Sequence, residues 1–199
     1  MTESAHTAVD VVSWRTGVHD LYAEVRAEPE PRQAHALWVA HRSAMFLEHP
    51  ASPRLGQQRL HHGGYDPAYR FEVPLVEAEP EDWTYATGTD GEVPFVRVGR
   101  FELGHLGALD AWWLESYGGG LFVPLRDGSA GDTSYGAGRY LLDTVKGADL
   151  GRADEDRWVL DLNFAYNPSC AYDPRWACPL APAGNRIDRS VPVGELTPG

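Results

Sequence analysis

The chain has 199 residues, a length that suits one domain with a substantial core. Hydrophobic residues make up 43% and charged residues 23%, as in ordinary globular proteins. The net charge of −12 repels phosphate backbones and anionic lipids, so we expect neither nucleic acid nor a membrane as a partner. The first residues resemble no secretory signal and no apolar run could span a bilayer, so the expected location is the cytoplasm.

Two helices are predicted near the N-terminus. Residues 1–8 are small and polar, and we expect them to be frayed. Apolar residues over 9–28 recur at three- and four-residue spacings, which predicts a helix that two prolines then stop. A second such stretch over 32–48 places His41 on its apolar stripe, where a partly buried histidine is expected. The two helices should form an antiparallel hairpin over residues 9–48.

From residue 69 onward the hydrophobic period changes to two, which is typical of strands with one buried face. Turn signals rich in glycine and aspartate separate the runs. Many short strands without helices between them predict a mainly antiparallel β-barrel or closed sandwich. The predicted fold class is therefore α+β, a single domain over 1–199 with its β core at 69–199. The predicted strands span residues 70–75, 82–88, 93–103, 108–117, 120–125, 135–143, 158–162 and 191–196.

The segment from Asp161 to Arg186 follows neither period, yet it contains both cysteines and several aromatic residues. Its aromatic content argues against disorder, because such side chains normally find something to pack on. Long loops inside a compact domain tend to be functional. We expect an ordered loop that seals the core and forms the rim or floor of a pocket.

Several unusual short sequence motifs in the C-terminal half occur in an order and spacing that resemble those of one bacterial family. These motifs are FVPLRD at 122–127, SYGAGRY at 134–140, LDLN at 160–163, AYNPSCAY at 165–172, CPL at 178–180 and NR at 185–186. The family is the domain-of-unknown-function 1684 family, and the resemblance covers roughly Leu121 to Glu195. Where the family usually has a Gly-Leu-x-Tyr word, this chain has HHGGY at 61–65, which implies a different ligand if that segment borders the pocket. The resemblance implies one domain with an antiparallel β core and brings no established activity.

Asp161 and Asn163 follow a predicted strand and share one of its faces, because side chains alternate along a strand. If that face is the interior, both need partners, and Arg126 or Arg139 could pair with Asp161. Such a pair would be a structural network that pins the long loop. Alternatively, a lone carboxylate in a dry cavity would have a raised pKa and could act as a general base.

The two cysteines allow several interpretations. Cys170 and Cys178 could be packed thiols in a reducing cytosol or an adventitious disulfide. A zinc site would need further ligands such as His61, His62 or His105, although the usual CxxC spacing is absent. A nucleophilic Cys170 would need a nearby cation, for which Arg139, Arg175 and Arg186 are candidates.

Two glycine-containing segments, at 61–65 and 134–139, are further candidates for a special backbone conformation. Gly63 and Gly64 follow two histidines, and backbone there can approach a ligand closely, although solvent-exposed loop histidines are the commoner outcome. The glycines of SYGAGR lack the GK[ST] and helix of a phosphate loop, so they predict a bend at a barrel corner. Trp112 and Trp113 should lie on opposite faces of a strand, one of them in the core.

We expect a small-molecule protein with an aromatic pocket inside the barrel. The leading hypothesis is a cofactor-independent enzyme that cyclises, isomerises or hydrolyses a hydrophobic substrate, since no fingerprint for nucleotide, flavin or haem appears. Its predicted catalytic residues are Asp161 as base, Arg139 as electrostatic clamp, and Cys170. Its predicted substrate-binding residues are Asn163, Tyr166, Asn167, Tyr135, Arg126, Arg186 and His62. No metal or cofactor is predicted; the alternatives are a non-catalytic binding barrel and a metal-dependent enzyme using His61 or His62 with Cys170 or Cys178.

Overall fold

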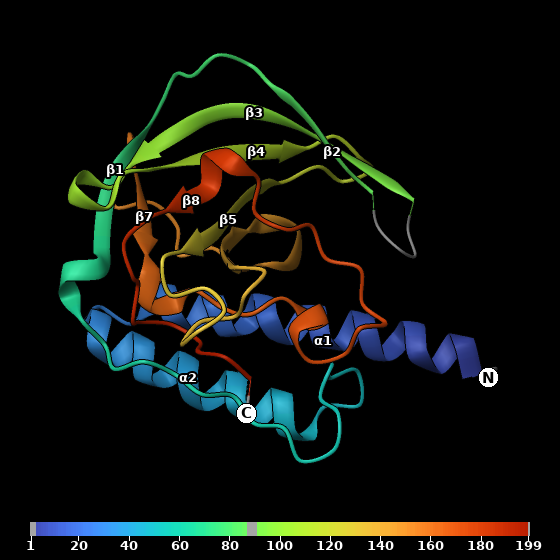
Figure 1. Ribbon diagram of the computed structural model, residues 1–199. Coiled ribbons are helices and arrows are strands. Elements are labelled where there is room, and N and C mark those ends of the chain that lie inside the picture. Colours follow the sequence, from blue (N-terminus) through green and yellow to red (C-terminus); the bar gives the residue numbers. More distant parts are fainter. Residues whose placement is uncertain (1–2, 87–90, 199) are drawn as a thin grey trace.

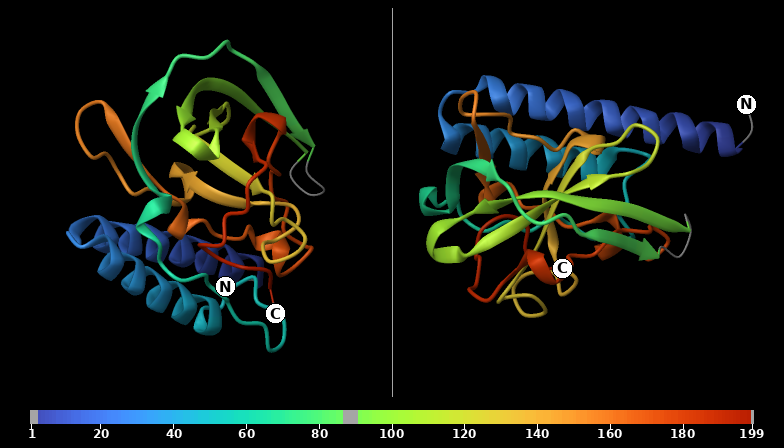
Figure 2. Two further views of the ribbon diagram at one scale, coloured as in Figure 1. Left: turned by 60° about the vertical axis from the view of Figure 1, so that its left-hand side comes forward. Right: turned by 90° about the horizontal axis from the view of Figure 1, so that it is seen from above.

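The computed structural model describes residues 3–86 and 91–198 and has a helical hairpin below a curled antiparallel sheet (Figure 1). Helix α1 spans Glu3–Ala27 and helix α2 spans Pro31–Glu48, and the two pack side by side as the predicted hairpin. The N-terminal part of α1 projects beyond the sheet (Figure 2, right). Helix α1 begins at Glu3, six residues before the predicted start at residue 9, and residues 1–2 lie outside the described part. No helix in the described ranges is long and apolar enough to cross a bilayer.

The buried face of α2 differs from the predicted one. Its buried residues are Ala34, His35, Trp38 and Phe46, and Arg42 follows in the same row with its side chain only 14% exposed. The side chain of His41 is 52% exposed and lies 3.3 Å from the carboxylate of Glu24, so the prediction of a partly buried His41 is wrong. The row was missed because an arginine occupies one of its inward positions, where a hydrophobic pattern expects an apolar residue.

Within the described residues, eight strands form one sheet in the order β6-β5-β4-β3-β1-β7, with β2 paired to β3 and β8 to β5. The pairs along this path are antiparallel, and β8 runs parallel to β5. The sheet curls into a half-barrel whose open side faces the helices (Figure 2, left). The predicted α+β architecture is confirmed. The strands are β1 Arg70–Val76, β2 Asp82–Ala86, β3 Glu92–Glu102, β4 Ala108–Leu114, β5 Leu121–Asp127, β6 Arg139–Asp143, β7 Arg157–Asp161 and β8 Arg186–Ile187.

The first seven predicted strands correspond to β1–β7, although several are shorter than expected. The sixth begins at Arg139 because the chain turns at Gly138, whose φ is +99° and whose Cβ would lie 2.6 Å from the carbonyl of Leu125. This turn agrees with the predicted bend in SYGAGR. Residues 87–88 of the second predicted strand lie outside the described residues.

The eighth predicted strand, residues 191–196, is wrong. The carbonyls of Val191, Val193 and Glu195 accept hydrogen bonds from the guanidinium of Arg139. An arginine side chain therefore takes the place of a neighbouring strand along this segment, which stays irregular apart from one bridge between Glu195 and His62.

Three groups of buried side chains hold these parts together. The largest fills the curled sheet, the second joins the hairpin to the long loop, and the third is an aromatic cluster next to Cys178. Trp112 belongs to the aromatic cluster and Trp113 is 44% exposed, so the two lie on opposite faces as predicted. The loop over 161–186 is ordered, and its fully buried Asn185 accepts from the indole of Trp112 while its amide donates to two carbonyls of β4 and β5.

Candidate functional site

A largely enclosed cavity lies between the helical hairpin and the long loop, and we call it the inner chamber. Its volume is about 50 Å³, enough for a few atoms beyond a single water. Four tyrosines, one asparagine, one serine and two cations shape its polar wall, and apolar side chains, several of them from α1 and α2, complete it. The polar residues that line it are Tyr22, Arg42, Tyr140, Lys146, Tyr166, Asn167, Ser169 and Tyr172.

A buried ion pair forms one side of this chamber. Arg42 donates from Nε and Nη2 to the two carboxylate oxygens of Glu195, whose side chain is fully buried. The guanidinium of Arg42 also lies over the ring of Tyr166, 4.7 Å from its centroid. Although burial acts in the opposite direction, Arg42 lowers the pKa of Glu195 to about 2. Behind the chamber wall, paired with the lining residue Arg42, therefore lies a buried carboxylate that stays ionised throughout the ordinary pH range.

Glu195 also connects the hairpin to the long loop. Its carboxylate accepts from the backbone N–H of Asn167 at 2.7 Å and from the hydroxyl of Tyr172 at 3.2 Å. The side-chain amide of Asn167 donates to the same tyrosine hydroxyl at 3.0 Å. These bonds fix two loop side chains against the end of α2, so the chamber has a preformed polar floor.

Two buried polar atoms on the chamber wall lack hydrogen-bond partners among the described residues. They are the side-chain oxygen of Asn167 and the hydroxyl of Tyr22, which lies near the indole N–H of Trp38, itself without an acceptor. Burial raises the pKa of Tyr22, so its hydroxyl stays protonated and available as a donor. A buried polar group without a partner costs about 1–3 kcal/mol, unless water or a ligand satisfies it. One free donor and one free acceptor thus line the same small space.

A second cavity, the outer chamber, continues from the inner one and shares Trp14, Val18, Pro53, Lys146 and Ser169 with it. Its volume is about 160 Å³, and Cys178 and Trp176 line its far side. Lys146 pairs with Asp143 at 3.1 Å. The Asp143 carboxylate holds the pKa of Lys146 above its usual value, and 47% of the lysine side chain remains exposed. The two chambers are therefore neighbours that share part of their walls.

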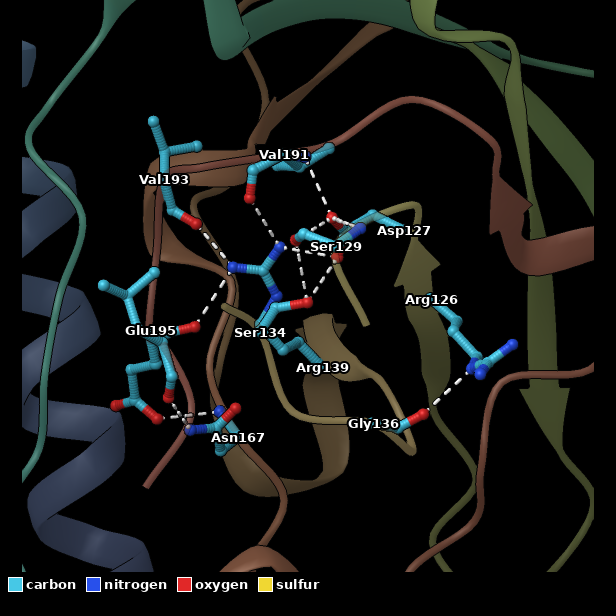
Figure 3. A network of polar contacts seen from close by, with 11 residues as sticks. Arg126, Asp127, Ser129, Ser134, Gly136, Arg139, Asn167, Val191, Val193 and Glu195 are labelled. Carbon is cyan, nitrogen blue, oxygen red and sulfur yellow. Dashed lines mark hydrogen bonds and ion pairs between the residues drawn. The ribbon is translucent and has the colours of Figure 1, made fainter. Parts of the chain in front are cut away.

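Arg139 lies in a different network and has a structural role (Figure 3). Its side chain is fully buried, pairs with Asp127 at 2.9 Å, and donates to the carbonyls of residues 191, 193 and 195. Asp127 in turn accepts from Ser129, Ser134 and the N–H of Val191. The register of β5 and β6 explains the pairing, because Leu125 lies opposite Arg139 and Asp127 follows two residues later on the same face.

The predicted pairing of Arg126 or Arg139 with Asp161 is therefore wrong. Arg126 donates to the carbonyl of Gly136 at 2.9 Å and turns away from this network (Figure 3). Arg186 is exposed in β8, directly opposite Arg126 in the register of β5 and β8. None of these three arginines lines either chamber.

Asp161 and Asn163 are buried together, but at the closed end of the hairpin, away from the chambers. The backbone and side-chain N–H groups of Asn163 donate to one oxygen of Asp161, and the amide of Asn163 also holds the backbone of Asp66. The second oxygen of Asp161 has no partner among the described residues. Burial raises the pKa of Asp161 to about 6. Asp161 also borders a separate open pocket of about 310 Å³, which Arg26, Arg70 and Arg152 surround.

The remaining predicted residues fall in two places. Tyr166 and Asn167 line the inner chamber, and His62 lies next to it with a ring nitrogen 3.7 Å from Glu195. Cys170 and Tyr135 meet at the aromatic cluster, where burial and the nearby Cys170 raise the pKa of Tyr135 to about 12. The structure therefore joins Tyr166, Asn167 and His62 into one site and separates them from Asp161 and Arg139.

The first glycine after His62 lies against the chain's own C-terminal segment. A Cβ on Gly63 would lie 2.1 Å from the carbonyl oxygen of Pro192, whereas one on Gly64 would have nothing within 4 Å. The absence of a side chain at Gly63 thus lets the C-terminal segment pack against it. The backbone N–H of Gly63 donates a hydrogen bond to the carbonyl of Gly194 in that segment. His62 and the cysteines belong to separate clusters, and the described residues form no group of three or more His, Cys, Asp or Glu side chains able to hold a metal ion.

Sequence reasoning missed Arg42, Glu195, Tyr22 and Lys146. Arg42 interrupts an apolar helix face, and this interruption is the signal that could have identified it. Glu195 and Lys146 stand in turn-rich segments where a charged residue is ordinary, so only the folded chain reveals their burial or position.

The fold and its cavities define an α+β half-barrel protein with internal chambers under a helical hairpin. The chain belongs to the family described as "Protein of unknown function (DUF1684)", whose model matches residues 58–196. The predicted family is confirmed, and the match begins well before Leu121. The chain is also similar to an uncharacterized protein of Haloarcula marismortui known from a solution NMR structure, with 32% identity over 80% of this chain and 90% of that chain and a TM-score of 0.57. No curated protein matches the chain.

Proposed function

We propose that this protein binds a small organic molecule with an anionic group, and that the anionic group enters the inner chamber. The observation that carries this proposal is the unpartnered hydroxyl of Tyr22, a donor in an enclosed aromatic space that two cations, Arg42 and Lys146, also line. Ligand sites are typically apolar cavities with a few convergent polar groups. The net charge of −12 supports a small molecule rather than nucleic acid as the partner.

The two cations keep donors available for such a group. Arg42 uses Nε and Nη2 for Glu195, and its Nη1 has no acceptor among the residues described. Lys146 has three N–H donors, of which the pair with Asp143 engages one. Each cation is neutralised by its own carboxylate, so a bound carboxylate would gain hydrogen bonds without facing a large field of either sign.

The ionisation states in the inner chamber favour binding over acid–base catalysis. A general acid or base works best with a pKa near the working pH. The pKa of Glu195 is lowered to about 2, while burial raises those of Tyr22, Tyr166 and Tyr172. The groups that shift in this chamber thus move away from neutrality, as suits fixed hydrogen-bonding partners.

Thermal unfolding with two matched probes tests the proposal. Benzoate should raise the Tm of the purified chain, and benzamide, its uncharged isostere, should not. Tyr22→Phe removes a buried hydroxyl without a protein partner, so the variant should keep or raise its Tm without ligand but bind benzoate about 5- to 30-fold more weakly, as for one lost hydrogen bond of 1–2 kcal/mol. Tyr117→Phe is the control, because Tyr117 is fully exposed. Equal shifts from benzoate and benzamide, or unaltered benzoate affinity in Tyr22→Phe, would refute the proposal.

A cofactor-independent acid–base enzyme is the second candidate, and one observation favours it. Asp161 has an unpartnered carboxylate oxygen, a pKa raised to about 6, and a fully buried position directly behind the wall of an open pocket. A pKa near the working pH suits a general base. Asp161→Asn should then abolish turnover of a substrate while the chain stays folded; a folded variant with full turnover would contradict this candidate.

A further inference from the structure

The two cysteines meet in the fold although they lie eight positions apart. Both are free thiols, and the backbone N–H of Cys170 donates to the sulfur of Cys178 at 3.3 Å. Cys170 sits in a short 3₁₀ turn, Ser169–Ala171, and the long loop then returns to place Cys178 against it. The loop thus presents two sulfurs side by side.

The surroundings of the two sulfurs differ. Cys178 is 7% exposed and lines the outer chamber together with Lys146 and Arg15, whereas Cys170 is half-buried. The other charged or titratable groups that face the pair are Asp143, which pairs with Lys146, and the hydroxyls of Tyr85, Tyr135 and Tyr140. The cavity therefore gives a small molecule access to Cys178 with a cation close by.

The pKa values of the two thiols shift in opposite directions. Interaction with the Cys170 thiol, the Cys170 N–H and the Lys146 charge together lower the pKa of Cys178, although burial opposes them. The same interaction, together with burial, raises the pKa of Cys170. The thiolate is the nucleophilic form of cysteine, so Cys178 is suited to attack a substrate. Cys170, which keeps its proton, is suited to react afterwards with the oxidised Cys178.

We propose that Cys178 and Cys170 form a redox-active dithiol that reduces an organic hydroperoxide admitted through the outer chamber. Cys178 is the attacking sulfur and Cys170 the resolving thiol. The chamber walls fit such a substrate, because Trp14, Val18 and Trp176 contact its organic part and Lys146 faces its oxygen atoms. This role goes beyond the ligand binding proposed for the inner chamber and does not depend on it.

The chemistry balances in two steps. The Cys178 thiolate attacks the terminal oxygen of ROOH, so that an S–O bond forms, the O–O bond breaks, and the alkoxide takes a proton from Lys146 to leave as ROH. Lys146 regains the proton that the Cys178 thiol released on ionising. Cys170 then attacks the resulting sulfenic acid, the S–S bond forms, and hydroxide leaves as water with the Cys170 proton. The peroxide gains two electrons and the two thiols lose two. A thiol reductant restores the dithiol by exchange.

The test uses the full chain, reduced with dithiothreitol, desalted and mixed with cumene hydroperoxide. Intact-mass and peptide measurements should show the loss of two hydrogens and a bond between Cys170 and Cys178. Cys178→Ser should lose peroxide consumption, and Cys170→Ser should accumulate a sulfenic acid on Cys178 that dimedone traps. Lys146→Gln should slow the first step about 100-fold, the lower end of what a positioned general acid contributes. Peroxide consumption at the unaltered rate in Cys178→Ser, or dimedone on Cys170 instead, would overturn the proposal.

A measurement on the unaltered chain guards against a variant that fails to fold. Iodoacetamide should label Cys178 with a half-maximal rate at a pH below the value of about 8.5 of an ordinary cysteine. Labelling of both cysteines with an ordinary pH profile would equally overturn the proposal. Benzoate binding is measured separately, so failure of the thiol chemistry and failure of the binding role are told apart.

Discussion

Asp161→Asn offers a direct measure of what burial does to one carboxyl. In the folded chain the pKa of Asp161 rises from 3.8 to about 6. Each unit corresponds to 1.36 kcal/mol, so the ionised side chain destabilises the fold by up to about 3 kcal/mol above pH 6. Relaxation of the pocket and entry of water reduce this figure, and about 1–3 kcal/mol is the expected range.

The sign of the effect follows from linkage. A carboxyl with a raised folded-state pKa favours the fold below its unfolded pKa, near 4, and this contribution is lost as the pH rises through 6. An asparagine does not ionise, so the stability of Asp161→Asn relative to the unaltered chain should increase by about 1–3 kcal/mol between pH 4 and pH 7.

Urea unfolding of both proteins at pH 4, 5, 6 and 7 measures this difference. The readout is the change of the difference with pH, because any constant cost of the new amide cancels. Asp82→Asn serves as the control, since Asp82 is an exposed carboxylate at the start of β2. A difference that stays constant from pH 4 to pH 7 would refute the reasoning, because Asp161 would then titrate alike in the folded and unfolded chains.

Two further predictions concern the contacts that join the hairpin to the core. Glu195→Gln leaves the Arg42 guanidinium without its counter-charge and should lower the free energy of unfolding by about 3–5 kcal/mol in urea at pH 7. Because the folded chain lowers the pKa of Glu195 from 4.5 to about 2, its stabilisation is present above pH 4.5 and declines toward pH 2, so the gap should narrow in acid; a gap that widens there contradicts this account. Gly63→Ala forces a Cβ to within 2.1 Å of the Pro192 oxygen, and overpacking of this kind should cost about 1–3 kcal/mol in thermal unfolding. Gly64→Ala has open space and should be neutral, so equal Tm values for the two variants would show that the C-terminal segment does not press on residue 63.

The hydrophobic period determined most of the fold in advance. The α1 stripe and the alternating burial along β2 are local patterns, and they follow from hydrophobic periods of 3.6 and 2. The same rule failed for residues 191–196, where apolar residues alternate but their backbone carbonyls bind a side chain, Arg139, instead of a strand. A period shows which residues face inward, but it does not show which backbone groups pair.

The candidate site was predictable only in part. Tyr166 and Asn167 were singled out because the long loop concentrates aromatic and amide groups. Their partners Arg42 and Glu195 come from segments that surround this loop in sequence, and no local pattern links them. The sequence left open which face of its strand is interior; Asp161 is buried, but its register places it at the closed end of the hairpin rather than in the inner chamber. Side-chain alternation fixes a face, whereas a site depends on which elements cover that face.

The ion pair between Arg42 and Glu195 joins residues 153 positions apart. Closing so long a loop costs entropy that only the assembled core offsets, so the inner chamber exists in the fully folded state and not in partly folded ones. A ligand in this chamber therefore stabilises the whole fold rather than one segment, by about 2.7 kcal/mol at 100 times its Kd. Some backbone amides exchange their hydrogens with solvent only when the whole chain unfolds. Such amides in β4 and β5, on the far side of the core, would then be protected from exchange as strongly as those of the helices beside the ligand.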